Sequence, residues 1–276
     1  MISDKAIIDK NFKIESSIEV GPFSVISKDV KIGKNTKIHS HVVITGDTNI
    51  SEDCEIYSFA SIGSNPQDLK FKGEKTKLVI GKKNKIREYV TINPGTTHGG
   101  GLTTIGDNCL FMISSHVAHD CKIGNNVILA NNVALAGHVE IDDNVIIGGN
   151  SAVQQFTRIG KFAMIGGMTG VEKDVIPFGL VTGNRSHLEG INIIGLKRAG
   201  YSNDEINALN EAVKLIFSND ILKNGIENAK KLANFITSFT VLKFANFFAF
   251  SIPFFKMSLE KINLTASFNA LISSFE

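Results

Sequence analysis

Aliphatic residues recur at every sixth position along most of this chain. The recurring residues form two series, each with its own register of six. The first is Ile2, Ile8, Ile14, Val20, Ile26, Ile32, Ile38, Ile44, Ile50, Ile56, Ile62, Ile80, Ile86 and Ile92, and the second is Ile105, Phe111, Val117, Ile123, Leu129, Leu135, Ile141, Ile147, Val153, Ile159, Ile165 and Val171. A period of six matches neither an amphipathic helix nor a simple alternating strand. It is typical of a β-helix, in which a short strand and a turn recur as one unit.

The residues around each recurring aliphatic predict how one unit turns into the next. The residue two positions earlier is usually small or β-branched, as at Ser24, Cys54 and Ala163. We expect the aliphatic side chain to point inward, the small residue to fill the corner, and the coils to stack as a parallel sheet. If three units make one coil, residues 18 apart stand about 4.8 Å above one another. This spacing predicts a stacked amide ladder through Asn108, Asn126 and Asn144.

Two segments interrupt the pattern, and the chain changes character after it. Residues 64–78 are polar and rich in lysine, and residues 94–103 are rich in Gly and Thr. Because the register resumes after each, we expect loops that project from the coil, and loops on rigid scaffolds often bind ligands. The register fails at Pro177, and helical signals start near Tyr201. Ser202 and Glu205 form a capping box, and the apolar positions Ile206, Leu209, Val213 and Ile216 then fall on one helix face.

The fold class predicted is therefore mainly β, a parallel β-helix of hexapeptide repeats followed by an α-helical C-terminal domain. We expect the β-helix domain to span residues 1–186 and the helical domain to span residues 187–276. Further helices are predicted over residues 221–239 and 241–251, before Pro253.

Composition restricts the functional classes. The formal net charge of +2 gives no global attraction for polyanions, so no nucleic-acid partner is expected. No window reaches the roughly 18 apolar residues of a membrane span, and the N-terminus does not resemble a signal peptide. Three scattered cysteines indicate reduced thiols. We expect a cytoplasmic protein without stable membrane insertion.

Three histidines supply the candidate chemistry. His116, His119 and His138 fall on one vertical strip of the predicted coil, and Gly137 follows His119 by one full coil. A neutral imidazole can remove a proton from a hydroxyl or an amine. The backbone N–H of a glycine on the next coil can face the oxyanion that forms on an attacked carbonyl. Asp120 could orient the ring of His119.

Other interpretations of the same residues stay open. The three imidazoles could donate to Zn²⁺ in a zinc-dependent β-helix hydratase, although the spacing of His116 and His119 is narrower than usual there. The histidines could also be ordinary outward residues of a non-catalytic, structural β-helix.

A family resemblance covers roughly residues 1–250. The segments that carry it are residues 116–125, 128–132 and 135–139, the 67–70 loop, the 99–102 turn and residues 195–198. They resemble the acyl-carrier-protein–UDP-N-acetylglucosamine O-acyltransferases, which begin lipid A biosynthesis. The resemblance implies a left-handed coil and a homotrimer with sites between subunits. It implies transfer of a 3-hydroxyacyl chain to the 3-hydroxyl of UDP-N-acetylglucosamine, with no metal or other cofactor. The donor would be carried on the phosphopantetheine of acyl carrier protein.

The resemblance also implies roles for individual residues. His119 would be the general base, Gly137 the oxyanion donor, and Gly167 the point that limits acyl length. The residues implied to contact substrates are Asp68, Lys70, His116, His138, Gln155, Asn192 and Arg198. Gln154 and Ile194 depart from the residues that many relatives carry at those positions. A 3-amino analogue of the sugar remains an alternative acceptor.

Acyl carrier protein is acidic, so a basic cluster would provide its docking surface. The candidates are Arg158, Lys161, Arg185, Lys197, Arg198, Lys230 and Lys231.

Overall fold

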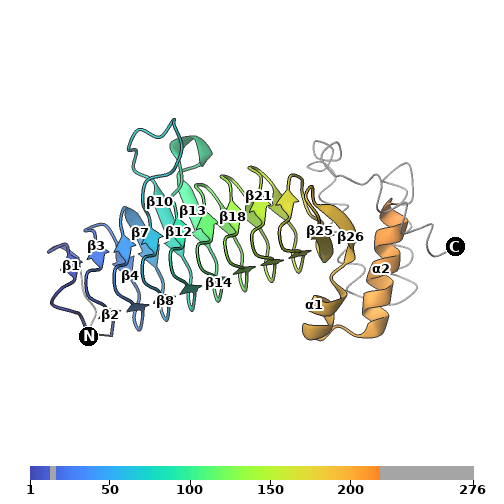
Figure 1. Cartoon of the computed structure of the whole chain (residues 1–276), viewed down its shortest axis with the longest axis horizontal. Helices are drawn as coiled ribbons and strands as arrows, with labels where there is room; N and C mark the ends of the chain where they lie inside the picture. The colour runs from blue at the N-terminus through green and yellow to red at the C-terminus, as the bar shows by residue number, and fades with distance from the viewer. Residues whose placement is uncertain (13–16, 218–276) are drawn as a thin grey trace.

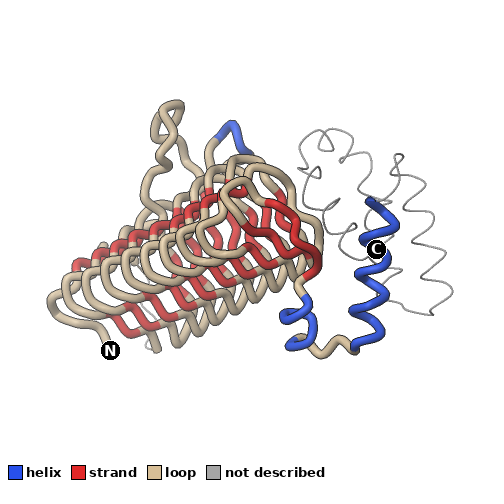
Figure 2. The backbone as a smooth tube through the Cα atoms, turned by 45° about the vertical axis from the view of Figure 1, so that its right-hand side comes forward, coloured by secondary structure: helices blue, strands red, loops and turns tan. Residues whose placement is uncertain are grey.

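The computed structural model describes residues 1–12 and 17–217, and it shows a long triangular prism with helices at one end (Figures 1 and 2). Three sheets form the three faces of the prism, and the chain visits them in turn on every coil. Face I is the nine-stranded sheet, face II the seven-stranded sheet and face III the ten-stranded sheet. The three edges are named after the faces that they join.

Most strands are two residues long. Face I contains β1 (Ile7–Ile8), β3 (Val25–Ile26), β6 (Val43–Ile44), β9 (Ser61–Ile62), β12 (Thr91–Ile92), β15 (His116–Val117), β18 (Ala134–Leu135), β21 (Ala152–Val153) and β24 (Gly170–Val171). Face II contains β4 (Lys31–Ile32), β7 (Asp47–Ile50), β10 (Lys77–Ile80), β13 (Leu102–Ile105), β16 (Lys122–Ile123), β19 (Glu140–Ile141) and β22 (Arg158–Ile159). Face III contains β2 (Glu19–Val20), β5 (Lys37–Ile38), β8 (Glu55–Ile56), β11 (Lys85–Ile86), β14 (Leu110–Phe111), β17 (Ile128–Leu129), β20 (Ile146–Ile147), β23 (Met164–Ile165), β25 (Gly179–Thr182) and β26 (His187–Ile191).

The strand register confirms that three hexads make one coil. His116 pairs with Ala134 and Ile128 pairs with Ile146, each 18 residues on. Across the two interruptions the partners are Asp47 with Lys77 and Lys77 with Leu102, so the register closes over both inserted segments. Both loops leave the prism at the I–II edge, where they rise above β10 and β13 (Figure 1).

The interior is filled by the recurring aliphatics, as the sequence predicts. Ile44, Ile86 and Leu135 are fully buried, and Phe111 is the largest side chain in the column. The small inward residues close the corners by hydrogen bonding to the next coil, as where the Ser24 hydroxyl donates to the His39 carbonyl at 2.7 Å.

The three cysteines share this inward position. Cys54, Cys109 and Cys121 are free and buried, and the thiol of each donates to a backbone carbonyl of the next coil at 3.2 Å. Burial raises the pKa of Cys54 and of Cys109 to about 11, and that of Cys121 to about 12. These thiols are therefore packing groups rather than nucleophiles.

Many corners turn through a residue with left-handed backbone angles. Asp120, His138 and Phe156 have φ of 59°, 63° and 64°, which is an unfavourable region for residues with a Cβ. Stacking holds them there, because the backbone N–H of His138 donates to the His119 carbonyl of the preceding coil at 3.0 Å. The first rung of the predicted amide ladder is confirmed, since the Asn108 side chain donates to Asn126 at 2.7 Å.

The C-terminal end of the prism is closed by a hairpin and two helices. Strand β26 runs antiparallel to β25 and belongs to face III, so the predicted boundary between residues 186 and 187 falls within this hairpin. Helix α1 (Ile193–Arg198) and helix α2 (Asn203–Phe217) follow.

The predicted capping box starts α2. The Ser202 hydroxyl accepts from the Glu205 backbone N–H at 3.3 Å, and the Glu205 carboxylate accepts from the Ser202 N–H at 2.9 Å. Ile206, Leu209, Val213 and Ile216 are all buried, so the predicted apolar face is confirmed. The helices predicted over 221–239 and 241–251 lie outside the described residues. Within residues 1–12 and 17–217, no helix has the length and apolar character needed to cross a bilayer.

Candidate active site

The candidate site lies on the I–II edge, at two consecutive corners below the inserted loops. His119 and Asp120 occupy the turn between β15 and β16, and Gly137 and His138 occupy the turn between β18 and β19. The predicted neighbours are therefore adjacent in space, one coil apart. What brings them together is the repeat itself, because the turn residues of successive coils fall in one column.

His119 is held against Asp120. Its Nδ1 lies 2.8 Å from Oδ2 of Asp120, and the His119 side chain is 12% exposed while that of Asp120 is 1% exposed. The carboxylate accepts from Nδ1–H, so the lone pair of the ring lies on Nε2. The arrangement leaves Nε2, the ring nitrogen that Asp120 does not contact, free to act as a base.

Gly137 lies directly against the ring of His119. A Cβ built on Gly137 would meet Cε1 of His119 at 2.5 Å and Nε2 at 2.8 Å, so only glycine permits this approach. The residue is buried, yet its backbone N–H finds no acceptor among the described residues. A buried, unused N–H beside a basic nitrogen can donate to an anionic oxygen that forms there.

His138 and His116 flank this pair. The His138 ring is edge-on to His119 with centroids 5.1 Å apart, and it stacks on Phe156 at 4.4 Å. Burial lowers the pKa of His138, which the charge of Asp120 partly opposes. Burial also lowers the pKa of His116, and His119 adds to that effect. Both flanking rings are therefore neutral near pH 7 and can donate or accept hydrogen bonds.

Several contacting residues are not evident in the sequence. Thr91 Oγ1 lies 2.7 Å from Nδ1 of His116, and it comes from the coil above. Thr96, in the second inserted loop, binds both oxygens of Asp120. Phe156 forms an apolar floor below His138. Thr91 and Phe156 could have been found by counting one coil up or down, whereas the contact with Thr96 depends on the path of a loop.

The other predicted site residues on this edge are Asp68, Lys70 and Gln155. Asp68 is half-buried in the first inserted loop, its carboxylate accepts from the Lys70 backbone N–H at 3.0 Å, and its charge acts on His138. The side chain of Lys70 is exposed. Gln155 is exposed at the corner that follows Gly137.

Three predicted residues lie on other edges. Gly167 is exposed at the III–I edge, where a Cβ would meet the backbone of Gly149, its carbonyl oxygen at 3.3 Å. Asn192 and Arg198 begin and end α1, beside the II–III edge. Asn192 caps the helix by accepting from Gly195 N–H at 3.0 Å, and it donates to the Phe162 carbonyl at 3.1 Å. One protomer therefore does not bring these residues to His119.

His119, Asp120 and His138 each place one potential metal-ligand atom within 4.8 Å of the others. His116, which the zinc interpretation requires, is not in this group. The oxygens of Asp120 already accept hydrogen bonds from Thr96 and His119, so this donor set fits a hydrogen-bonded dyad better than a metal centre.

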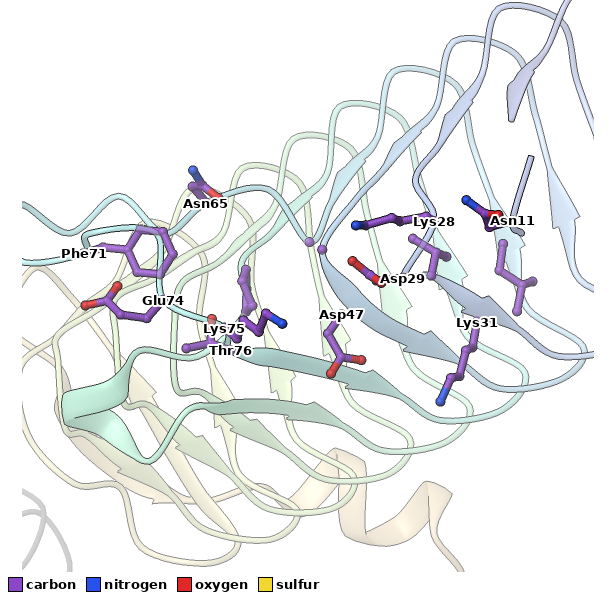
Figure 3. A pocket seen from close by; sticks show the side chains of 15 residues that line it. Asn11, Lys28, Asp29, Lys31, Asp47, Asn65, Phe71, Glu74, Lys75 and Thr76 are labelled. Atoms are coloured by element: carbon purple, nitrogen blue, oxygen red, sulfur yellow. The ribbon is translucent and has the colours of Figure 1, made fainter. Parts of the chain in front are cut away.

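A groove of about 760 Å³ lies on the same edge, on the N-terminal side of the first loop (Figure 3). Its lining mixes lysines with acids, among them Lys28, Lys75, Asp29 and Glu74. None of the predicted site residues lines it. The groove and the histidine cluster are therefore separate features, and the chemistry lies with the histidines.

The predicted basic cluster is largely paired. Arg158, Lys161 and Arg185 lie within 3.6 Å of Asp174, Asp143 and Glu172 respectively. Lys197 and Arg198 are exposed at the end of α1, and Lys230 and Lys231 lie outside the described residues.

The stacked hexad coil places this chain in the class of hexapeptide-repeat acyltransferases. The bacterial transferase hexapeptide model matches residues 2–46, 102–137 and 121–155. The model of UDP N-acetylglucosamine O-acyltransferase, domain 2, matches residues 174–251.

Relatives carry the identification further. The acyl-(acyl-carrier-protein)–UDP-N-acetylglucosamine O-acyltransferase of Thermodesulfovibrio yellowstonii is 48% identical over 231 residues, covering 83% of this chain and 90% of that protein. That of Paracoccus denitrificans is 55% identical over 153 residues, covering 55% of this chain and 59% of that protein. The matched segment thus spans less than two thirds of the Paracoccus protein.

The crystal structure of the UDP-N-acetylglucosamine O-acyltransferase from Moraxella catarrhalis superposes with a TM-score of 0.83 at 42% identity, covering 89% of this chain and 96% of that one. The chain belongs to the acyl-carrier-protein–UDP-N-acetylglucosamine O-acyltransferase family of enzymes, and its coil is the left-handed parallel β-helix of that family.

Proposed function

We propose that this protein transfers a 3-hydroxyacyl chain from acyl carrier protein to the 3-hydroxyl of UDP-N-acetylglucosamine, the first step of lipid A biosynthesis. The observation that carries the proposal is the His119 ring, fixed by Asp120 and lying against the unused N–H of Gly137. Family membership supports the choice of donor and acceptor.

The geometry supplies both halves of an acyl transfer. Nε2 of His119 takes the proton of the sugar hydroxyl while the oxygen attacks the thioester carbonyl. The carbonyl oxygen becomes an oxyanion, which accepts from Gly137 N–H. When the intermediate collapses, the C–S bond breaks, and the departing pantetheine thiolate receives the proton from the His119 imidazolium. His119 accepts and returns the proton, and Gly137 N–H stabilises the negative charge. The step therefore requires no metal or other cofactor.

Asp120 stabilises the imidazolium that exists during the intermediate. Its carboxylate is 1% exposed and lies 2.8 Å from Nδ1. An ionised partner in a site with little water strengthens this interaction. His116 and His138, both neutral, are then available to hold donor and sugar through hydrogen bonds.

We also propose that the active unit is a homotrimer. The outward residues of face III in the C-terminal half of the coil are large and apolar, whereas those of face I are small. The two rows are Leu110, Ile128, Ile146 and Met164 on face III, and Ala134, Ala152 and Gly170 on face I.

Face II differs, because its outward residues are charged and Lys122 donates to Glu140 at 2.8 Å. Packing face III of one copy on face I of the next leaves face II in water and is a heterologous contact that can close into a ring. The family resemblance implies that the ring has three copies. This packing also places the II–III edge of one subunit beside the I–II edge of its neighbour. Arg198 of one subunit then lies near His119 of the next. This explains why the predicted contacts lie on different edges of one protomer.

The partners and compartment follow from this proposal. Acyl carrier protein approaches through Lys197 and Arg198, the exposed cations of α1. The protein works in the cytoplasm, where three buried thiols without disulfides stay reduced.

The reaction is tested by incubating the protein with acyl carrier proteins of graded chain length and with UDP-N-acetylglucosamine. Mass spectrometry should detect an O-acylated sugar nucleotide. If the protein transfers the acyl group only to the 3-amino analogue, that analogue is the acceptor and the proposed acceptor is wrong. If the protein transfers no acyl group and instead shows a hydratase activity that chelators abolish, it is a zinc-dependent hydratase and not an acyltransferase.

Subunit mixing tests the shared site. His119→Ala and Arg198→Ala subunits are each expected to give inactive or weakly active trimers. Co-refolding them one to one should restore activity at about a quarter of the sites, because a site with both intact residues needs one subunit of each kind. No recovery in mixed trimers would place both residues in one subunit's site.

A further inference from the structure

The second inserted loop holds the carboxylate of Asp120 in a clamp. The loop contains the 3₁₀ turn η1 (Thr97–Gly99), which Thr96 caps. Thr96 donates to Asp120 twice, from its backbone N–H to Oδ1 at 2.9 Å and from its hydroxyl to Oδ2 at 2.7 Å. Both residues are almost fully buried, with exposed fractions of 3% and 4%.

The direction of these hydrogen bonds is fixed by the other partners. The Thr96 hydroxyl oxygen accepts from the Gly99 N–H at 3.2 Å, so its own hydrogen is free to point at the carboxylate. A carboxylate only accepts, so Nδ1 of His119 must be the donor in the third bond, at 2.8 Å. The chain of donors therefore specifies which nitrogen of His119 carries the proton.

Two more contacts complete the clamp. The Asp120 backbone N–H donates to the Thr103 hydroxyl at 2.8 Å, where the second loop rejoins the coil. Behind the carboxylate lies Gly99, and a Cβ there would overlap Cγ and both oxygens of Asp120. Glycine is thus required at 99 for the loop to close over the acid.

We propose that Thr96 is a positioning residue that, through Asp120, keeps His119 protonated on Nδ1 and leaves Nε2 free to act as the base. The inserted loop would then serve catalysis by holding the Asp120 carboxylate against His119, rather than by binding a substrate. The activity readout rests on the proposed function, whereas the spectroscopic readout does not.

The main variant is Thr96→Val, which keeps the shape and removes the hydroxyl. We expect kcat to fall roughly tenfold with little change in KM, as for loss of a hydrogen bond to a charged group. Thr96→Ser should restore kcat. Thr97→Val is the matched control, because Thr97 is the exposed neighbour in the same turn, and it should behave like the wild type.

Nitrogen-15 spectra of the substrate-free protein test the clamp directly. In the wild type and Thr96→Ser, His119 should show a protonated Nδ1 and an unprotonated Nε2. In Thr96→Val the other tautomer should gain population, and in Gly99→Ala, which displaces the carboxylate by steric overlap, it should gain more.

Three results separate the outcomes. Unchanged spectra and an unchanged kcat in Thr96→Val would overturn the proposal. So would an activity loss that follows only the unfolded fraction, measured by thermal unfolding of the same samples. Changed spectra in a protein that makes no acylated sugar would uphold the clamp and reject the proposed reaction instead.

Discussion

Two columns of corner residues, on different edges of the same prism, use one backbone geometry for different purposes. On the II–III edge, the N–H groups of Lys82, Asp107 and Asn125 are each capped by a side-chain oxygen one coil further on, at 2.7–2.8 Å. On the I–II edge, the equivalent N–H of Gly137 has no such cap among the described residues. The first column only stabilises the stack, and the second leaves a donor available.

The side chains differ in the same way. Asn125 bonds to Asp143 of the next coil at 3.0 Å, and the N–H of Asn125 is the main cause that lowers the pKa of Asp143. His119 stands at the equivalent position but bonds sideways to Asp120, and the next coil offers Gly137. The candidate site thus differs from the II–III column in lacking its stacking interaction between coils.

The largest expected effect comes from His119→Ala. If His119 is the general base, as proposed, its loss should lower kcat by about 10²–10⁴-fold. The protein should stay folded, because Asp120 keeps both bonds from Thr96. Asn125→Ala is the matched change in the other column. It should cost about 1 kcal/mol of unfolding free energy and leave kcat unchanged. Equal kinetic losses in both variants would mean that the columns do not differ as described.

Gln155→Asp should convert the site column into a copy of the structural one. A carboxylate one coil after Gly137 would cap its N–H as Asp143 caps that of Asn125. Because the oxyanion then loses its donor, kcat should fall about 10²-fold. Gln155→Ala, which removes the amide without capping, should retain more activity than Gln155→Asp. If the alanine variant is the weaker one, the glutamine side chain matters and the capping argument fails.

The smallest expected effect concerns pH and stability. Burial lowers the pKa of His116 below the ordinary value of 6.5, so His116 takes up a proton at a higher pH in the unfolded chain than in the folded chain. Folding stability should therefore decline as the pH falls below about 6.5. His116→Gln should flatten that decline in thermal unfolding scans between pH 7.5 and 5.5. A steeper decline in the variant would show that the buried ring is not the group responsible.

The repeat made much of this architecture predictable. The spacing of Ile and Val residues fixed the coil, the inward cysteines and the neighbourhood of His119 and Gly137, because stacking is a local rule applied many times. The capping box at Ser202 predicted α2 because it, too, depends on residues close together in the sequence. Helix α1 and the β25–β26 hairpin were not predicted, since they follow Pro177, where the repeat ends.

The support of Asp120 could not be predicted from the sequence. Thr96 lies 24 positions before it, in a loop whose path depends on glycine turns and on the capping of η1. The roles of Asp68, Lys70, Gly167, Asn192 and Arg198 rest on family resemblance and stay predictions.

The most direct test of the central claim is a crystal structure of the wild-type protein with UDP-N-acetylglucosamine bound. The 3-hydroxyl oxygen should lie about 3 Å from Nε2 of His119, within reach of an acyl carbon whose oxygen faces Gly137 N–H. A sugar held elsewhere, for example in the groove beside Lys28 and Lys75, with its hydroxyl far from His119, would contradict the account.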